Sequence, residues 1–411
     1  MVVPRIAVDP AGTAAALLAV CCGVTLGTAS GLVPGLHANA FALGLASVAP
    51  AVPGPPRLVG AAMLAAGTTH TFLDVVPALA LGVPDPAMAA SALPGHRLVI
   101  AGRGREALRL SALGSGVAVL LAVPLAIPVT SAMRALYPAL RAHLSLVLGA
   151  VAVGLVVGER DAVAAVGAAL SLAASTALGA VVLPLSPASP LPVGSVLAPL
   201  FAGLFGAPVL IESLDGGGVP PQDDPTVGAR PRAVLGVAGL GTLAGAVVGY
   251  VPGVSAAIAA TGTLAALPRA GPRAFVVATS GVNTATAVFA LFAFVALGDA
   301  RTGVLVALDS AGVPVALPLL LASVGLAAAA GFALVPLLGD RYLAAARRMD
   351  ATRGALAVLA LLVVLAFAFA GPVGVGIFGA ATVVGSLPAR FRCRRAPLMG
   401  VLLGPLALGL V

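Results

Sequence analysis

The sequence predicts an all-α polytopic integral membrane protein, built from two inverted repeats with broken helices at Pro-Gly motifs. Three observations support this prediction. The 411 residues are 60% hydrophobic and only 9% charged, whereas a soluble protein of this size carries about 25% charged residues. Apolar runs of about 18 residues or more recur along the whole chain. One Pro-Gly motif also occurs in each half of the sequence.

The apolar segments form two series of seven, which together correspond to about 10–14 transmembrane helices. Segments 38–50 and 254–268 are short for a span, and Pro314 and Pro318 can interrupt segment 303–338. The first series covers 12–33, 38–50, 58–82, 108–130, 143–158, 162–183 and 193–210. The second series covers 233–251, 254–268, 274–298, 303–338, 354–371, 372–388 and 396–411.

A hydrophilic connector over residues 212–232 separates the two series and is rich in glycine, proline and aspartate. Such a segment cannot bury enough apolar surface to order itself in water, which favours a flexible linker. We therefore expect a first transmembrane repeat over 1–211, a hydrophilic linker over 212–232 and a second transmembrane repeat over 233–411.

The motif Gly-Leu-Val-Pro-Gly-Leu-His at Gly31–His37 returns in the second half of the chain as Gly-Tyr-Val-Pro-Gly-Val-Ser at Gly249–Ser255. Two breaks at matching positions in the halves of a hydrophobic chain are typical of the binding site of a secondary transporter. A single break would instead favour a kink that only helps helices to pack. Further matches, with slightly shorter separations along the chain, pair His70-Thr71 with Asn283-Thr284 and Leu81-Gly82 with Leu297-Gly298.

All 22 basic residues are arginine, and the net charge is +8. With the N-terminus outside and every segment spanning, 17 arginines fall in cytoplasmic loops, as the positive-inside rule requires. An odd number of spans in each half makes the halves run in opposite directions. Arginines in short gaps, with only 4% aromatic residues, argue against a nucleic-acid partner. The arginines left outside are Arg5, Arg57, Arg134, Arg141 and Arg301.

Each Pro-Gly motif predicts a break in a helix. Pro34 lacks a backbone N–H and Gly35 permits dihedral angles that other residues avoid, so the helix stops there and restarts near His37. The freed backbone groups cannot face lipid. The restarted half-helix directs unpaired N–H groups and a positive dipole end into the break, which suits a carboxylate. The second break, Gly249–Ser255, follows the same backbone logic.

Two polar stretches lie inside predicted spans, Gly67–Asp74 and Thr279–Thr286. Asp74 follows His70 by one helical turn. A carboxylate at membrane depth costs about 2.5–3.5 kcal/mol on insertion scales, which marks Asp74 as a functional candidate. The alternative is a polar pair that satisfies itself between helices. The hydroxyl and amide oxygens of Thr279–Thr286 suit Na⁺ coordination or hydrogen bonding to an anion.

These features define two groups of candidate residues. For ion coupling, with Na⁺ or H⁺ as the coupling ion, we expect Thr69, His70, Asp74 and Thr286. No cofactor is expected, because the three cysteines form no zinc-binding spacing. For substrate binding we expect Gly31, Pro34, Gly35, His37, Asn39, Gly249, Pro252, Gly253, Ser255, Asn283 and Thr284.

The remaining acids favour structural roles. Glu106 stands among arginines at a predicted helix start, which favours ion pairing. Asp85, Asp299 and Asp340 follow predicted helix ends, which favours solvated side chains. Asp309 lies in an apolar stretch, where it is either buried or part of a loop.

Four motifs carry a resemblance to a known family: Gly31–Asn39, Gly249–Gly253, Gly281–Thr284 and the loop from Ala92 to Leu108. On these motifs the chain resembles the large membrane subunit of the tripartite tricarboxylate transporters, the TctA family, and particularly its archaeal-type members. The likeness is strongest over about residues 23–130 and 236–310. It implies transport of citrate or another tricarboxylate. It also implies a small membrane subunit and an extracytoplasmic binding protein as candidate partners, without which archaeal-type chains can act.

Together these observations predict a multi-pass permease of the plasma membrane and not an enzyme. It would import a small organic anion, a tri- or dicarboxylate such as citrate, coupled to a Na⁺ or H⁺ gradient. Two alternatives stay open: a secondary transporter for a cation or an amino acid, and an intramembrane metalloenzyme built on His37, His70 and Asp74. A metalloprotease would normally carry a His-Glu-x-x-His motif, which the sequence lacks.

Overall fold

The computed structural model describes residues 9–82, 92–191, 194–214, 218–265 and 271–410. Within these ranges the regular structure is helical, with no strand, which confirms the all-α polytopic class. Eight of the described helices are long and apolar enough to cross a membrane, and four shorter apolar stretches have 10–17 residues. The predictions for Arg5 and Asp85 lie outside the described residues.

The helices of the two halves are labelled in chain order, with a π-helical stretch over Ala202–Gly206 and a 3-10 turn over Ala396–Met399. The first half contains α1 (Pro10–Gly31), α2 (Ala38–Val48), α3 (Pro56–Leu73), α4 (Val75–Leu81), α5 (Ala92–Ile100), α6 (Gly104–Ala142), α7 (Leu144–Val157), α8 (Ala162–Val182), α9 (Leu197–Phe201) and α10 (Ala207–Ser213). The second half contains α11 (Pro231–Tyr250), α12 (Ala256–Ala265), α13 (Pro272–Leu297), α14 (Gly303–Ser310), α15 (Leu317–Arg348), α16 (Ala351–Gly385), α17 (Leu387–Phe391) and α18 (Gly400–Ala407).

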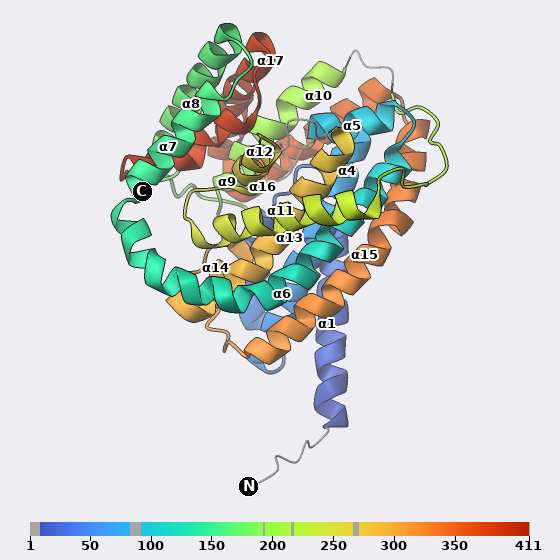
Figure 1. The fold of residues 1–411 in the computed structure, drawn as a ribbon, viewed down its shortest axis with the longest axis vertical. Coiled ribbons are helices and arrows are strands. Elements are labelled where there is room, and N and C mark those ends of the chain that lie inside the picture. The colour runs from blue at the N-terminus through green and yellow to red at the C-terminus, as the bar shows by residue number, and fades with distance from the viewer. Residues whose placement is uncertain (1–8, 83–91, 192–193, 215–217, 266–270, 411) are drawn as a thin grey trace.

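Helix α1 packs closely against α3, and α11 packs in the same way against α13. Three glycines of α1, each one helical turn from the next, face backbone or Cβ atoms of α3: Gly23, Gly27 and Gly31. Their counterparts in α11, among them Gly245, face α13. Small residues allow the close backbone approach on which helix association in lipid depends. Figure 1 shows that the N-terminal part of α1 projects beyond the rest of the bundle.

The pair of α1 with α3 and the pair of α11 with α13 can be aligned residue by residue. The α3–α4 unit covers Pro56–Leu81 and α13 covers Pro272–Leu297, each with 26 residues. Each ends at a glycine in the left-handed region, Gly82 with φ of 70° and Gly298 with φ of 75°. The predicted match of Leu81-Gly82 with Leu297-Gly298 therefore coincides with equivalent helix ends.

The predicted match of His70 with Asn283 is wrong. When the two units of equal length are aligned from end to end, His70 corresponds to Thr286. The glycine contacts give the same alignment, because a Cβ on Gly31 would meet Leu73 and a Cβ on Gly249 would meet Phe289. The sequence match failed because it rested on two polar residues within stretches that each contain several polar residues.

Each half also covers elements of the other. Helix α6 lies along α13, and α15 lies along α3. A Cβ on Gly35 would clash with Leu362 of α16, and a Cβ on Gly253 would lie 3.1 Å from Leu148 of α7. Both leucines are fully buried. These reciprocal contacts fit a duplicated chain, whereas the inverted sense of the repeats and the limits 1–211 and 233–411 stay predictions.

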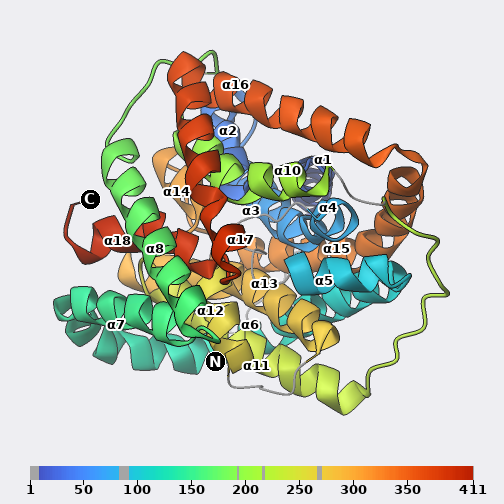
Figure 2. The ribbon, with the colours of Figure 1, turned by 90° about the horizontal axis from the view of Figure 1, so that it is seen from above.

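Helices α3–α4 and α13 form the centre of the molecule. They are the two most buried of the eight candidate spans, and Figure 2 shows them enclosed by α6, α11, α15 and α16. This position frees them from lipid contact. They can therefore carry the polar stretches that the sequence places inside the membrane.

Two long helices differ from simple spans. Helix α6 has 39 residues and a length of about 58 Å, almost twice the hydrocarbon thickness of about 30 Å. It contains three prolines and curves around the bundle (Figure 1). Helix α16 is interrupted at Gly371, with φ of 58°, just before Pro372. The predicted interruption of 303–338 is confirmed, because α14 ends at Ser310 and α15 begins at Leu317.

Ion pairs join the two halves. Arg273 Nε lies 2.8 Å from Glu106 Oε1, and Arg109 Nη2 lies 2.9 Å from Asp340 Oδ2. Glu106 also pairs with Arg103 at 2.8 Å, which confirms its predicted ion pairing. Asp340, expected to be a solvated residue beyond a helix end, instead lies within α15 and accepts hydrogen bonds from both terminal nitrogens of Arg109.

Hydrogen bonds connect the segment between the halves to α5 and to the start of α6. Gly104 N donates to Gln222 Oε1 at 2.7 Å, and Gln222 Nε2 donates to Val99 O at 3.1 Å. Further along, Gly228 N donates to Glu106 Oε1 at 2.8 Å. These bonds give residues 222–228 defined contacts with α5 and α6, whereas the flexible character of the linker stays a prediction. Polar contacts with α6 replace the apolar burial that its composition cannot provide.

We expect Gly27→Ala and Gly245→Ala to lower the free energy of unfolding by about 1–3 kcal/mol each. The added Cβ at residue 27 would clash with the Ala66 carbonyl oxygen, and the one at residue 245 would lie 2.6 Å from the Ala285 Cβ. Thermal unfolding of the purified protein in detergent measures the effect.

Gly236→Ala is the matched control, because Gly236 also lies in α11 but has no atom within 4 Å of its Cβ position. This variant should keep or slightly raise the melting temperature, since alanine favours helix over glycine. Equal melting temperatures for all three variants would contradict the packing argument.

Candidate functional site

The first break is a tight turn between α1 and α2. Leu36 N donates to Val33 O at 3.3 Å, and Gly35 between them has φ of 74°. Pro34 at the second position and a positive φ at the third are typical of a type II turn, in which glycine is favoured. The predicted stop and restart of the helix at this motif are confirmed.

The second break has the same geometry. Val254 N donates to Val251 O at 3.5 Å, and Gly253 has φ of 80°. Pro252 again stands at the second position of the turn. The repeated motif therefore encodes one backbone conformation twice, between α1 and α2 and between α11 and α12.

The residue after each turn caps the half-helix that follows. His37 Nδ1 accepts a hydrogen bond from Asn39 N at 2.9 Å at the start of α2. Ser255 Oγ accepts one from Ile258 N at 3.3 Å at the start of α12. As an acceptor, His37 Nδ1 carries no proton, so its Nε2 holds the N–H of a neutral ring. The ring stacks on Phe201 with centroids 4.9 Å apart.

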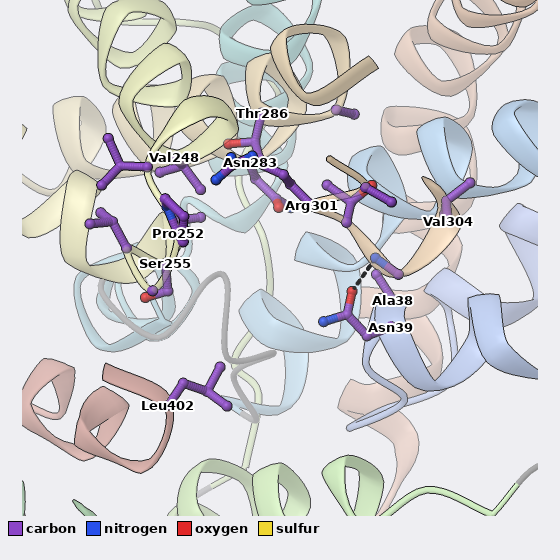
Figure 3. Close-up of a pocket in the computed structure, with 18 of the residues that line it drawn as sticks. Ala38, Asn39, Val248, Pro252, Ser255, Asn283, Thr286, Arg301, Val304 and Leu402 are labelled. Carbon is purple, nitrogen blue, oxygen red and sulfur yellow. Dashed lines mark hydrogen bonds between the residues drawn. The ribbon is translucent and has the colours of Figure 1, made fainter. Parts of the chain in front are cut away.

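A cavity of about 590 Å³ lies between the two breaks. Figure 3 shows Ala38 and Asn39 on one side, Pro252 and Ser255 on the other, and Asn283, Thr286 and Arg301 between them. The first turns of α2 and α12 both line this cavity. In each first turn one N–H donates to the capping side chain, and the remaining N–H groups that have no carbonyl partner within their own helix are available to an anion. The volume is in the usual range for a small-molecule site, about 300–1,000 Å³.

Eight of the expected site residues line the cavity, from both groups of the sequence prediction. Asn39 Oδ1 accepts a hydrogen bond from Gly303 N at 2.9 Å (Figure 3), which ties the start of α2 to the start of α14. Its side-chain NH₂ group is not used in that bond. The lining residues are His37, Asn39, Asp74, Pro252, Gly253, Ser255, Asn283 and Thr286.

Asp74 lies at the junction of α3 and α4, with 5% of its surface exposed. Pro77 lacks the N–H that would bond to the Leu73 carbonyl, which weakens the helix at this point. The Asp74 carboxylate accepts a hydrogen bond from Asn283 Nδ2 at 2.8 Å. The cavity thus contains a carboxylate held by an amide from the equivalent helix of the other half.

The other expected residues lie away from the cavity. Pro34 and Gly35 form the first turn, while Gly31 and Gly249 pack on the central helices. Thr284 Oγ1 donates to Ser115 Oγ at 2.8 Å between α13 and α6.

Two expected ion-coupling residues also point elsewhere. Thr69 is fully buried against Gly27 of α1. His70 Nδ1 lies 2.9 Å from Ser30 Oγ, and its ring stacks on Phe41 at 5.7 Å. His70 and Asp74 therefore have different partners, although one helical turn separates them.

The prediction omitted a charged group at one end of the cavity. Arg301 and Asp299 precede α14, and Tyr137 and Arg141 lie at the end of α6; all four line the cavity. Asp299 Oδ2 accepts hydrogen bonds from Tyr137 Oη at 2.6 Å and from Arg301 Nη2 at 3.0 Å. Arg301 Nη2 also donates to Tyr137 Oη. Asp299 follows the end of α13 and is partly exposed, as expected, and it also pairs with Arg301, which the prediction did not include.

A signal for these residues was present in the sequence. Arg141 and Arg301 are among the few arginines that the predicted topology leaves outside. Exceptions to a strong positive-inside bias are candidates for functional charge, and Asp299 stands two positions from Arg301. The other two outside arginines that the structure describes, Arg57 and Arg134, do not line the cavity.

Two broken helices around a shared cavity, within an all-helical membrane protein, are typical of secondary-transporter folds. Among the described residues no group of three or more His, Cys, Asp or Glu side chains is arranged to hold a metal ion. The family model of the tripartite tricarboxylate transporter TctA family matches residues 17–400. The chain therefore belongs to the TctA family, which confirms the resemblance.

Family membership has three consequences. The family is one of transporters and not of enzymes. The members of the family are components of tripartite tricarboxylate transporters, whereas the transport activity and the substrate of this chain stay proposals. With eight candidate spans, the chain is a multi-pass protein of the plasma membrane.

One relative with a curated record is an uncharacterised protein of Methanocaldococcus jannaschii. It is 31% identical over 145 residues, which are 32% of this chain and 34% of that protein. The match thus spans about a third of the relative's length. No solved structure matches the chain.

We expect Asn39→Ala and Asn39→Asp to separate stability from anion binding. Alanine removes the acceptor for Gly303 N, which should lower the free energy of unfolding by about 1–2 kcal/mol. Aspartate keeps that acceptor but adds negative charge beside the first turn of α2. The aspartate variant should therefore keep the melting temperature and lose citrate binding by about tenfold or more.

Thermal unfolding and equilibrium binding of citrate are measured on the same preparations. Ser47→Ala is the control, because Ser47 lies on the exposed side of α2 and bonds only to its own helix. Citrate binding by the aspartate variant at the unmodified level would contradict an anion site at the start of α2.

Proposed function

We propose that the chain is the permease of a secondary transport system that imports a small organic anion, a tri- or dicarboxylate such as citrate. Transport would proceed by alternating access and be coupled to a Na⁺ or H⁺ gradient. The main support is the convergence of the two Pro-Gly breaks on one cavity, which exposes the N-terminal ends of two half-helices to a ligand. Such ends favour negatively charged groups.

The substrate would lie between the first turns of α2 and α12. His37 Nε2 and the Asn39 NH₂ group would donate to it from one break, and Ser255 and backbone N–H groups from the other. Asn283 would contribute from α13. The remaining expected residues, Gly31, Pro34, Gly35, Gly249 and Thr284, would act indirectly by shaping the breaks and the packing around them.

The coupling ion would bind near Asp74, the buried carboxylate between the two breaks. Thr68 and Thr71 line the cavity on the same face of α3, and Thr68 Oγ1 is buried with no hydrogen-bond partner in the described part of the chain. A carboxylate with hydroxyl oxygens suits a hard cation such as Na⁺, and the carboxylate alone suits H⁺. Thr286 faces the cavity from α13, whereas Thr69 and His70 are placed to support the packing of α1.

Two partners would complete the system, a small membrane subunit and an extracytoplasmic binding protein. Both fit the tripartite organisation of the family. They would deliver substrate to the permease, which lies in the lipid bilayer. Uptake by proteoliposomes that contain the purified chain, with and without these two proteins, measures whether transport depends on them.

A second candidate is a transporter for an amino acid. The cavity contains two carboxylates, Asp74 and Asp299, next to anion-binding helix ends. A zwitterion could use both kinds of group. The family and the guanidinium of Arg301, which lines the cavity, favour a tri- or dicarboxylate over an amino acid.

Uptake by proteoliposomes that contain the purified chain tests the proposal. Labelled citrate is compared with other tri- and dicarboxylates and with amino acids, under imposed Na⁺ or proton gradients. We expect gradient-driven, saturable uptake of a carboxylate. Uptake of an amino acid alone would support the second candidate, and no uptake of any organic anion, with or without the partner proteins, would count against the proposal.

We expect Asp74→Asn to reduce gradient-stimulated uptake by about tenfold or more, because loss of one charged ligand weakens cation binding by at least about 1.4 kcal/mol. Asp309→Asn is the matched control, since Asp309 is exposed at the end of α14 and does not line the cavity. Unchanged gradient dependence in the Asp74 variant would remove this residue from the coupling role.

A further inference from the structure

Arg301 is much more buried than expected for an arginine in a short loop between two helices. Its side chain is only 8% exposed, although it lies in the short segment between α13 and α14. It lines the cavity, and Figure 3 shows it between the two breaks. A buried guanidinium is costly unless its donors have acceptors.

Residues in the described part of the chain accept hydrogen bonds from only some of the donors of this guanidinium. Nη2 donates to Asp299 and to Tyr137, and the carbon Cζ lies 5.0 Å from the centre of the Tyr137 ring. The Nε–H is buried, and none of the described residues accepts a hydrogen bond from it. A planar guanidinium presents its donors in a fixed fork, so the donors that contact neither Asp299 nor Tyr137 can bind a second carboxylate.

Asp299 is much less buried than Arg301, with 40% of its side chain exposed, and both residues line the cavity. Asp299 and an anion in the cavity would therefore compete for the same guanidinium. Tyr137 also donates a hydrogen bond to the Asp299 carboxylate. Asp299 would therefore stay in place when an anion replaces it at Arg301.

We propose that Arg301 binds a carboxylate of the transported anion and that Asp299 competes with that carboxylate for the guanidinium. This inference rests on the proposed function, since it names the residue that selects an anionic substrate. Arg301 would add a full positive charge to the partial charges of the two helix ends. Its position two residues before Gly303, whose N–H donates to Asn39, would also connect the bound anion to the first turn of α2.

The directions in which two substitutions change the affinity for citrate distinguish this role from a structural ion pair. Arg301→Gln removes the charge and should weaken citrate binding by about 10- to 100-fold. Asp299→Asn keeps an oxygen acceptor for Tyr137 and Arg301 but removes the competing charge, so citrate binding should tighten by about three- to tenfold. If the pair were only structural, breaking it from either side would weaken binding in the same direction.

Equilibrium binding of citrate to the purified full chain in detergent provides the readout, with folding checked by thermal unfolding. Arg134→Gln is the matched control, because Arg134 is an exposed arginine near the same end of α6 that does not line the cavity. We expect this variant to bind citrate within about twofold of the unmodified protein. If the Arg301 variant fails to fold, the sign of the Asp299→Asn effect decides the question.

Three results would overturn the inference: unchanged binding in a folded Arg301→Gln variant, weaker binding in Asp299→Asn, or no binding of citrate, tricarballylate, malate or succinate by the unmodified protein. Failure of the proposed function gives a different result. In that case the unmodified protein binds citrate but shows no gradient-driven uptake in proteoliposomes. The binding test of Arg301 then still stands.

Discussion

Backbone N–H and C=O groups cannot be left unpaired in lipid, and this constraint determines where a helix in the membrane can break. The two Pro-Gly turns satisfy it by lying between protein layers. Each is covered by a buried leucine of the other half, Leu362 or Leu148. Their remaining polar groups face the cavity between α2 and α12. The close packing of α1 on α3 and of α11 on α13 holds the breaks at this depth, so the glycines of those helices support the site indirectly.

The backbone of the site is nearly symmetric, whereas its side chains are not. Both turns have a positive φ at the same glycine position, and both half-helices begin with a capping residue. Yet the first half contributes His37, Asp74 and Arg141, and the second contributes Asn283, Asp299 and the more buried Arg301. Duplication can supply paired helix ends for an anion, while divergence of a few side chains can supply a cation site on one side and a selective guanidinium on the other.

The sequence predicted the features that depend on local backbone chemistry. Proline and glycine determine the breaks wherever they stand, so the turns and the interruption before Leu317 could be predicted, whereas the capping by His37 and Ser255 was not. The direction of each side chain within a polar stretch could not. Thr68, Thr71 and Asp74 face the cavity while Thr69 and His70 face α1, because rotation about a buried helix depends on packing on all sides. Arg301 was missed because a loop arginine looks like topology information until its burial is known.

The central claim is that both Pro-Gly breaks contact one substrate. It is tested most directly by thiol labelling of Ala38→Cys and Ser255→Cys, each in a background where Cys21, Cys22 and Cys393 are serine. A single cavity between the breaks predicts that citrate slows labelling at both positions with the same concentration dependence. Protection at only one position, or at neither under conditions where citrate binds, would contradict a shared site.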